Sequence, residues 1–211
     1  YYETSRGCPF SCSYCLSSVD KRLRFRDIEL VKKELQFFLD HKVPQVKFVD
    51  RTFNCKHEHS IAIWKYIMEH DNGITNFHFE VAADILNEEE LELLEQMRPG
   101  LVQLEIGVQS TNMKTIQEIH RVMDFEKVSK IVRRIQDAGN VHQHLDLIAG
   151  LPYEDVESFA HSFDDVYALK PEQLQLGFLK VLKGSYMDEK KNDYGVLYEA
   201  EPPYEVFSTN W

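Results

Sequence analysis

The amino-acid sequence predicts an α/β fold in which a parallel sheet forms an open or partial barrel. Six strand-like segments are separated by stretches with helical periodicity, and this alternation is typical of parallel sheets. Six such units are too few for a complete eight-unit barrel. The predicted strands cover residues 1–6, 44–50, 76–82, 101–108, 141–149 and 173–179.

Apolar residues at helical spacing predict a helix between each pair of consecutive strands. Asp27 can cap the first helix, and the spacing of Asn87 and Glu90 resembles a capping box for the third. Asp124 and Gly139 suit the start and the end of the fourth. The first helix starts near residue 27, and the others cover about 57–70, 87–97, 125–138 and 155–169.

The composition limits the possible functions. The chain has 211 residues, of which 43% are hydrophobic and 28% charged, as in an ordinary globular protein of one large or two small domains. A net charge of -11 disfavours a broad nucleic-acid surface, which needs a basic face. No apolar run is long enough to span a bilayer. The connector Ser17–Arg26 holds four basic residues, which we expect to form a solvated loop, with contact to an anionic ligand as the alternative.

Three of the four cysteines lie within the stretch Gly7–Cys15, in a C-x3-C-x2-C pattern. Thiolates this close together in a loop can converge on one metal centre. An iron–sulfur cluster normally takes four cysteines, so three ligands would leave one iron open to a small molecule. A three-cysteine zinc site is the alternative, and it would need a fourth protein ligand. The available candidates for that ligand are Cys55, His57 and His59.

Polar and apolar residues alternate along four of the predicted strands. Because side chains two positions apart share a face, these strands present a polar face opposite an apolar one. If helices cover the apolar face, the polar face lines the barrel interior, and we predict a wet cavity for a polar ligand. An antiparallel sheet with one solvated face is the alternative. The polar positions are His78, Glu80, Gln103, Glu105, Gln109, His142, His144, Asp146, Gln173 and Gln175.

The cysteine motif, with Tyr14 just before its last cysteine, resembles the signature of the radical S-adenosylmethionine (SAM) superfamily. The resemblance covers roughly residues 1–180. It implies a partial (β/α)6 TIM-like barrel in which Cys8, Cys12 and Cys15 bind a [4Fe-4S] cluster. The amino and carboxylate groups of SAM would chelate the fourth iron.

Further segments resemble particular branches of this superfamily. Residues 79–82, 105–110 and 146–152 are similar to the branch that holds oxygen-independent coproporphyrinogen oxidase, the methylthiotransferases and the cobalamin-binding enzymes. The stretches Val49–Phe53 and Pro202–Val206 resemble the cobalamin-linked members. We therefore expect a core at 1–183 and a C-terminal extension at 184–211, a loop or peripheral strand. The first residue is Tyr1, and we expect a separate N-terminal cobalamin-binding domain to be missing from this fragment.

The same resemblance implies which residues contact SAM. Many members carry a Gly-Gly-Glu segment after the second strand, and Asp50 stands there as the residue for the SAM amino group or a nearby contact. Carboxylates and amides suit ribose hydroxyls, and arginine suits a carboxylate. The other contacts would be Glu80 and Arg121 at the methionyl end, Gln109 and Asp146 at the ribose, and Tyr14 and Ile148 near the adenine.

The resemblance predicts a radical SAM enzyme domain. Its cluster would cleave SAM to methionine and a 5′-deoxyadenosyl radical, which abstracts hydrogen from an unknown substrate. One alternative is a cobalamin-dependent radical methyltransferase, with cobalamin held in the full-length protein, and another is a non-catalytic metal-binding or redox scaffold. The expected partners are a small molecule or other substrate and an electron donor such as flavodoxin or ferredoxin, without nucleic acid or membrane. Clustered metal-binding cysteines favour a reducing compartment, the cytoplasm.

Overall fold

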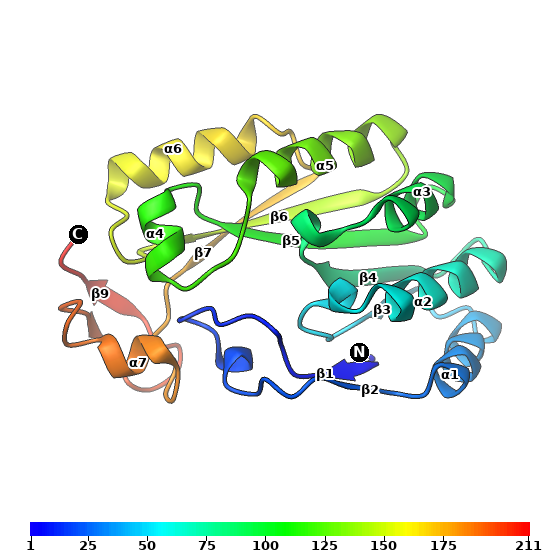
Figure 1. The fold of residues 1–211 in the computed structure, drawn as a ribbon, viewed down its shortest axis with the longest axis horizontal. Coiled ribbons are helices and arrows are strands. Elements are labelled where there is room, and N and C mark those ends of the chain that lie inside the picture. Colours follow the sequence, from blue (N-terminus) through cyan, green and yellow to red (C-terminus); the bar gives the residue numbers. More distant parts are fainter.

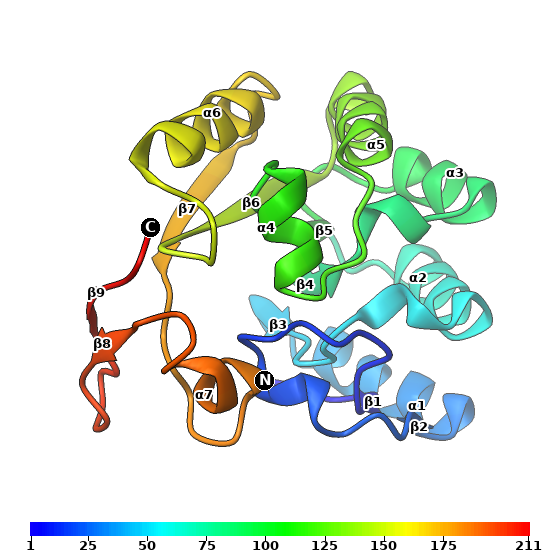
Figure 2. The same ribbon diagram turned by 60° about the vertical axis from the view of Figure 1, so that its left-hand side comes forward.

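A five-stranded parallel sheet forms the centre of the molecule and curls into part of a barrel (Figures 1 and 2). The computed structural model describes residues 1–211. The strands are adjacent in chain order, so each connection crosses over through the outer layer of the fold. They are β3 (Gln45–Lys47), β4 (Asn76–Val81), β5 (Val102–Gln109), β6 (His142–Ala149) and β7 (Gln173–Phe178). The partial barrel predicted from the sequence is confirmed.

The predicted first strand joins this sheet by a single bridge. Tyr2 pairs with Phe48 in parallel orientation, beyond the end of β3. The chain then turns away, and β1 (Ser5–Arg6) pairs with β2 (Arg24–Phe25) as a short antiparallel ribbon. At the other edge, β7 pairs only with β6. The sheet therefore stays open between β7 and the N-terminal segment.

Helices cover the outer face of the sheet, and local signals set their ends. The side chain of Asp27 accepts hydrogen bonds from the amides of Glu29 and Leu30, and Asn87 and Glu90 form the complete capping box that their spacing predicts. None of the helices combines the length and apolar character that a membrane span needs. The main helices are α1 (Ile28–Asp40), α2 (His57–Glu69), α3 (Glu88–Gln96), α5 (Phe125–Ala138) and α6 (Val156–Tyr167).

The alternating strand residues separate onto two faces, as predicted. Phe79, Leu104 and Leu145 belong to one apolar core that also contains residues of the covering helices. The polar residues between them lie side by side on the other face, because the register pairs Glu80 with Glu105 and Glu105 with His144. The sheet therefore has a dry outer face and a polar inner face.

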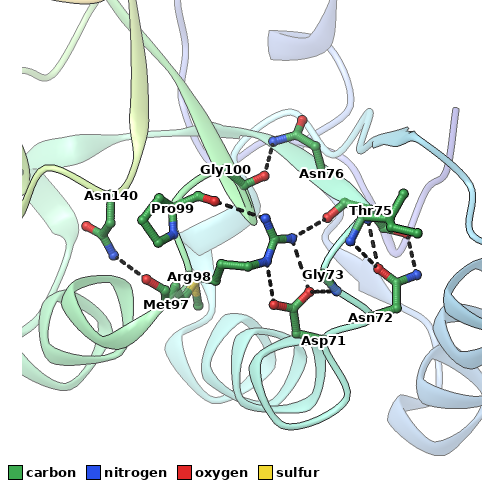
Figure 3. Close-up of polar contacts among 11 residues, drawn as sticks. Asp71, Asn72, Gly73, Thr75, Asn76, Met97, Arg98, Pro99, Gly100 and Asn140 are labelled. Carbon is green, nitrogen blue, oxygen red and sulfur yellow. Dashed lines mark hydrogen bonds and ion pairs between the residues drawn. The ribbon is translucent and has the colours of Figure 1, made fainter.

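The amino ends of the strands are closed by a hydrogen-bonded network (Figure 3). Arg98 Nε and Nη2 donate to the two carboxylate oxygens of Asp71, at 2.6 and 3.1 Å. Arg98 Nη1 also donates to the carbonyl of Pro99, and Nη2 to that of Thr75. Asn140, which precedes β6, donates to the carbonyl of Met97. One arginine thus ties together the loops that enter β4 and β5.

The C-terminal residues contain more regular structure than the sequence predicts. They form α7 (Tyr186–Lys190), β8 (Leu197–Tyr198) and β9 (Val206–Ser208). A second apolar core joins this segment to the short helix α4 (Met113–Glu118), which is not among the predicted helices. Met187 is fully buried there, and its amide donates to the carbonyl of Ser13 in the cysteine stretch. The extension therefore packs against the loop that carries the cysteines.

Candidate functional site

The three clustered cysteines lie on a loop that follows β1. Gly7 begins this loop with a φ of +95°, and a Cβ there would overlap the carbonyl oxygen of Arg22, so only glycine fits without a shift. The amide of Cys8 donates to the carbonyl of Asp20 at 3.0 Å, and that of Ser13 to the carbonyl of Ile119 at 2.9 Å. The loop is thus attached to two other parts of the chain.

The thiols of Cys8, Cys12 and Cys15 are free, and the first two are buried. Cys8 Sγ lies 3.8 Å from Thr52 Oγ1. No three His, Cys, Asp or Glu side chains converge as a site for a single metal ion. Two of the three candidates for a fourth zinc ligand are already bonded, because His57 Nδ1 lies 2.9 Å from Glu90 Oε2 and His59 Nε2 lies 3.0 Å from Thr4 Oγ1. The third candidate, Cys55, has a free and partly buried thiol.

A cavity opens beside Cys12 at the carboxyl ends of the strands. It encloses about 700 Å³, part of which is open to solvent. Ligands of α/β folds collect at this end of a sheet, where successive strands and the loops after them present side chains together. Four of the predicted SAM residues line it, and they come from three strands and the loop after α4: Glu80, Gln109, Arg121 and Asp146.

Gln109 is held in an unusual backbone conformation at the end of β5. Its φ is +71°, and the pairing between β5 and β6 shifts register between Gly107 and Gln109. Such a bulge redirects a side chain at the end of a strand. The buried Oε1 atom of Gln109 has no hydrogen-bond donor in the protein, and neither does Oδ1 of Asp146. Two acceptors therefore stand free in the cavity, which fits a ligand with hydroxyl groups.

Arg121 connects the cavity to the cysteine loop. Its Nη1 donates to Cys12 Sγ at 3.6 Å and to the hydroxyl of Tyr14 at 3.3 Å, and its Nη2 donates to the carbonyl of Gly107. Its Nε atom is buried without an acceptor. A guanidinium in this position can bind a carboxylate and can also stabilise a thiolate.

The cavity contains three carboxyl groups whose pKa values differ. The imidazole of His78 lies 3.0 Å from the carboxylate of Glu105, and Lys47 lies nearby. Their interactions with the carboxylate outweigh the effect of burial, so the pKa of Glu105 falls to about 2. Burial, reinforced by the charge of Glu105, raises the pKa of Asp146 to about 7. The same two causes raise the pKa of Glu80. One carboxylate is thus permanently ionised, while its neighbour Asp146 can gain a proton near neutral pH.

Asp50 differs from the expectation. Its carboxylate is fully buried and accepts hydrogen bonds from the amide and hydroxyl of Thr4 and from the hydroxyl of Ser5, at 2.6 to 3.2 Å. These bonds hold the N-terminal segment against the end of β3, and Asp50 does not line the cavity. The next two residues, Arg51 and Thr52, line it instead.

Tyr14 and Ile148 also lie outside the cavity lining. Both pack against the second apolar core, beside α4 and the C-terminal extension. Phe10, Asp84 and Glu105 complete the polar and aromatic lining and were not among the assigned SAM contacts. Glu105 was predicted on the polar inner face, where the register pairs it with Glu80, but it was not assigned to SAM.

The donors in this site fit the two expected cofactors. Three free cysteines on one loop would supply three of the thiolates that an iron–sulfur cluster needs. The adjoining cavity offers a guanidinium, carboxylates and an unpaired amide oxygen, which suit an amino acid and a ribose. Cys12 lines this cavity itself, so a group bound to its sulfur would border the cavity.

A family model described as the radical SAM superfamily matches residues 2–166. Oxygen-independent coproporphyrinogen III oxidase of Salmonella typhimurium is 34% identical over 107 residues, covering 48% of this chain and 23% of the relative. The cobalamin-dependent radical SAM methyltransferase TokK of Streptomyces tokunonensis is 26% identical over 216 residues, covering 92% of this chain and 30% of the relative. The chain therefore spans less than a third of the length of these two relatives.

Solved structures resemble the fold over nearly the whole chain. The radical SAM methyltransferase TsrM of Kitasatospora setae, with cobalamin and a [4Fe-4S] cluster bound, matches with a TM-score of 0.78 at 18% identity, over 95% of this chain and 40% of that one. Coproporphyrinogen III oxidase of Escherichia coli matches with a TM-score of 0.65 at 19% identity, over 96% and 47%. The family match covers most of the residues that build the barrel and the cysteine loop, and the chain belongs to the radical SAM superfamily.

Proposed function

We propose that this chain is the catalytic core of a radical SAM enzyme, with a [4Fe-4S] cluster on Cys8, Cys12 and Cys15 and SAM in the adjoining cavity. The observation that carries the proposal is that Cys12 and four polar residues of SAM-binding type line one cavity. When bound, the reduced cluster supplies the electron that cleaves SAM to methionine and a 5′-deoxyadenosyl radical, which takes hydrogen from the substrate.

The protein's own contribution is to bind and orient SAM and to exclude side reactions. Arg121 pairs with the SAM carboxylate, and Glu80 accepts from its amino group. The free oxygens of Gln109 and Asp146 accept from the ribose hydroxyls. Tyr14 and Ile148 stay as predicted adenine contacts. The hydroxyl of Tyr14 accepts from Arg121, which lines the cavity.

A second candidate is a cobalamin-dependent radical methyltransferase. It is favoured by the similarity to TokK along 92% of this chain and by the likeness to TsrM. In this case residues 1–183 form the radical SAM core, 184–211 extend it, and cobalamin lies on a further N-terminal domain of the full-length protein. Under either proposed function, the fully buried Asp50 would hold the N-terminal segment in place through its hydrogen bonds with Thr4 and Ser5.

The electron must come from a partner, for which a flavodoxin or ferredoxin is the proposed class. A cluster held by thiolates persists best in a reducing compartment, so we place the protein in the cytoplasm. The substrate is a small molecule or another acceptor that reaches the polar inner face of the sheet.

Anaerobic reconstitution with iron and sulfide tests the core proposal. We expect about four irons per chain by iron analysis, the absorption of an iron–sulfur cluster, and conversion of SAM to 5′-deoxyadenosine after reduction. Cys12→Ala should lose both the cluster and the cleavage. Cys55→Ala is the matched control, because Cys55 is also a free, partly buried cysteine but lies outside the motif.

Three outcomes separate the candidates. Cluster binding without any SAM conversion in the unaltered protein would favour the scaffold. Formation of S-adenosylhomocysteine by the full-length protein supplied with reduced cob(I)alamin, which can accept the methyl group of SAM, would favour the methyltransferase. Equal iron binding by the Cys12→Ala and unaltered proteins would contradict the assignment of the cluster ligands.

A further inference from the structure

Positive charge gathers at the start of this otherwise acidic chain. Residues 1–26 hold five basic and two acidic side chains, whereas the whole chain has 24 basic and 35 acidic ones. The β1–β2 ribbon sets Arg6 opposite Arg24, and like charges facing across strands are unfavourable. Positive charge is therefore concentrated here despite the repulsion between Arg6 and Arg24. The basic surface consists of Arg6, Lys21, Arg22, Arg24, Arg26 and Arg51.

Part of this basic surface is neutralised by neighbouring carboxylates, and part is not. Lys21, Arg22 and Arg51 are exposed and make no ion pair. Lys21 instead donates to neutral oxygens, the carbonyl of Phe10 and the hydroxyl of Ser11. The paired arginines are Arg6 with Glu3, Arg24 with Asp20, and Arg26 with Glu34, at 2.5 to 2.7 Å. Three uncompensated positive charges therefore remain.

The basic surface lies directly against the cysteine loop. Lys21 holds the loop between Cys8 and Cys12 through its bonds to Phe10 and Ser11. The carbonyl of Arg22 lies against Gly7, which immediately precedes Cys8. The backbone of the basic segment is thus in contact with the backbone of the proposed cluster ligands.

A groove continues from this surface to the cavity. Arg6 and Arg51 line the groove together with the acidic residues Glu3 and Asp20, and no hydrophobic side chain lines it. Arg51 also lines the proposed SAM cavity. The charges of the groove itself balance, so the excess positive charge comes from Lys21, Arg22 and Arg51, which are exposed and make no ion pair. This excess fits an anionic partner that touches the protein next to the cluster.

We propose that the basic surface is the docking site for an acidic one-electron carrier protein that reduces the cluster. This rests on the proposed function, in which each SAM cleavage consumes one electron. The carrier, a flavin or iron–sulfur protein, loses one electron and the cluster gains it, and no atom is transferred. Charge complementarity speeds the encounter and fixes its orientation, while the acidic remainder of the chain repels the carrier elsewhere.

Binding of an acidic flavodoxin to the cluster-loaded protein provides the first test. Arg22→Glu reverses an exposed, unpaired charge, and we expect it to raise the Kd about three- to tenfold at low salt. The difference should shrink as salt screens the charges. Arg133→Glu is the matched control, because Arg133 is exposed and unpaired on α5, which lies across the sheet from β1 and β2 (Figures 1 and 2).

SAM cleavage driven by either reduced flavodoxin or dithionite provides the second test. Arg22→Glu should lower the ratio of the flavodoxin-driven rate to the dithionite-driven rate, because dithionite needs no docking site. Failure of dithionite to support cleavage in the unaltered protein would sink the proposed function. Equal Kd values and equal rate ratios for Arg22→Glu and Arg133→Glu would overturn the docking site alone. Tighter binding of a short DNA duplex than of flavodoxin would overturn the choice of partner.

Discussion

Asp71 and Asp146 stand at opposite ends of the same sheet and are both partly buried, but their partners differ. Burial alone would raise the pKa of Asp71, yet hydrogen bonds from Arg98 outweigh it and hold the pKa below its ordinary value. Asp146 has no arginine beside it, and burial with the charge of Glu105 raises its pKa to about 7. Nε2 of His144, whose pKa burial lowers, lies 3.0 Å from Oδ1 of Asp146 but forms no hydrogen bond with it, so Oδ1 stays unpaired.

The two ends of the strands therefore have different roles: the amino end contributes to stability, and the carboxyl end binds the ligand. At the amino end, Arg98 supplies partners to the Asp71 carboxylate and to the carbonyls of Pro99 and Thr75 before any ligand arrives, although Oδ1 of the neighbouring Asn140 has no donor. At the carboxyl end, Gln109 and Asp146 keep acceptors without donors. Unpaired buried polar atoms cost stability, and that cost is recovered when a ligand supplies the missing bonds. The partial barrel thus divides its two ends as complete barrels do.

The largest effect is expected at the amino end. Arg98→Ala removes a two-point ion pair with a mostly buried Asp71 and two bonds to loop carbonyls, and should lower the free energy of unfolding by about 2 kcal/mol. Urea unfolding measures this loss. Lys130→Ala, which breaks a solvent-exposed pair with Glu126, should leave the urea midpoint almost unchanged. A change in SAM affinity of the same size in Arg98→Ala would break the division between the two ends.

A smaller effect is expected from a methyl group at the carboxyl end. In Gly107→Ala the new Cβ would overlap Nε2 of Gln109, so that side chain must leave its position. We expect about tenfold weaker SAM binding, or about 1.4 kcal/mol, from the lost ribose contact. Calorimetry on the cluster-loaded protein measures it. Gly177→Ala, where a Cβ makes only ordinary contacts at 3.5 Å or more, should bind SAM normally. Unchanged affinity in Gly107→Ala would remove Gln109 from the site.

The smallest effect concerns pH. Because the pKa of Asp146 is raised to about 7, its carboxyl is protonated below this pH and ionised above it. The ionised form is the better acceptor for ribose hydroxyls, so SAM affinity should rise a few-fold between about pH 6 and about pH 8. Glu105→Gln removes the neighbouring charge and should move this rise to lower pH. If the pH midpoint of the rise in SAM affinity is the same in Glu105→Gln as in the unaltered protein, another group, such as an inner-face histidine, is responsible.

The sequence was sufficient where a local pattern decides the structure. The alternation around Glu80 and Glu105 predicted the polar inner face, and the register confirms it. Asp124 and Gly139 predicted the ends of α5, where the side chain of Asp124 accepts from Lys127 and Gly139 takes the left-handed conformation. Both signals depend on backbone geometry within one element.

The sequence was insufficient where distant segments decide. Arg121 reaches Cys12 across 109 positions, and no local pattern contains that contact. The resemblance assigned Asp50 to the SAM amino group because it stands where many members carry a Gly-Gly-Glu segment, but Thr4 and Ser5 donate hydrogen bonds to its carboxylate. Helix α7 has too few turns to show a period, and its position depends on burial of Met187 in the second core.

The open side of the sheet has a consequence for the shape of the cavity. In a closed barrel, the number of strands and their stagger fix the radius. Here β7 pairs only with β6, and its Phe178 is 77% exposed, so no ring of hydrogen bonds constrains the curvature. A slight change of twist between neighbouring strands can widen or narrow the interior without breaking a ladder. The width of the interior therefore depends on the ligand that occupies it and on the groups that pack against the free edge of β7.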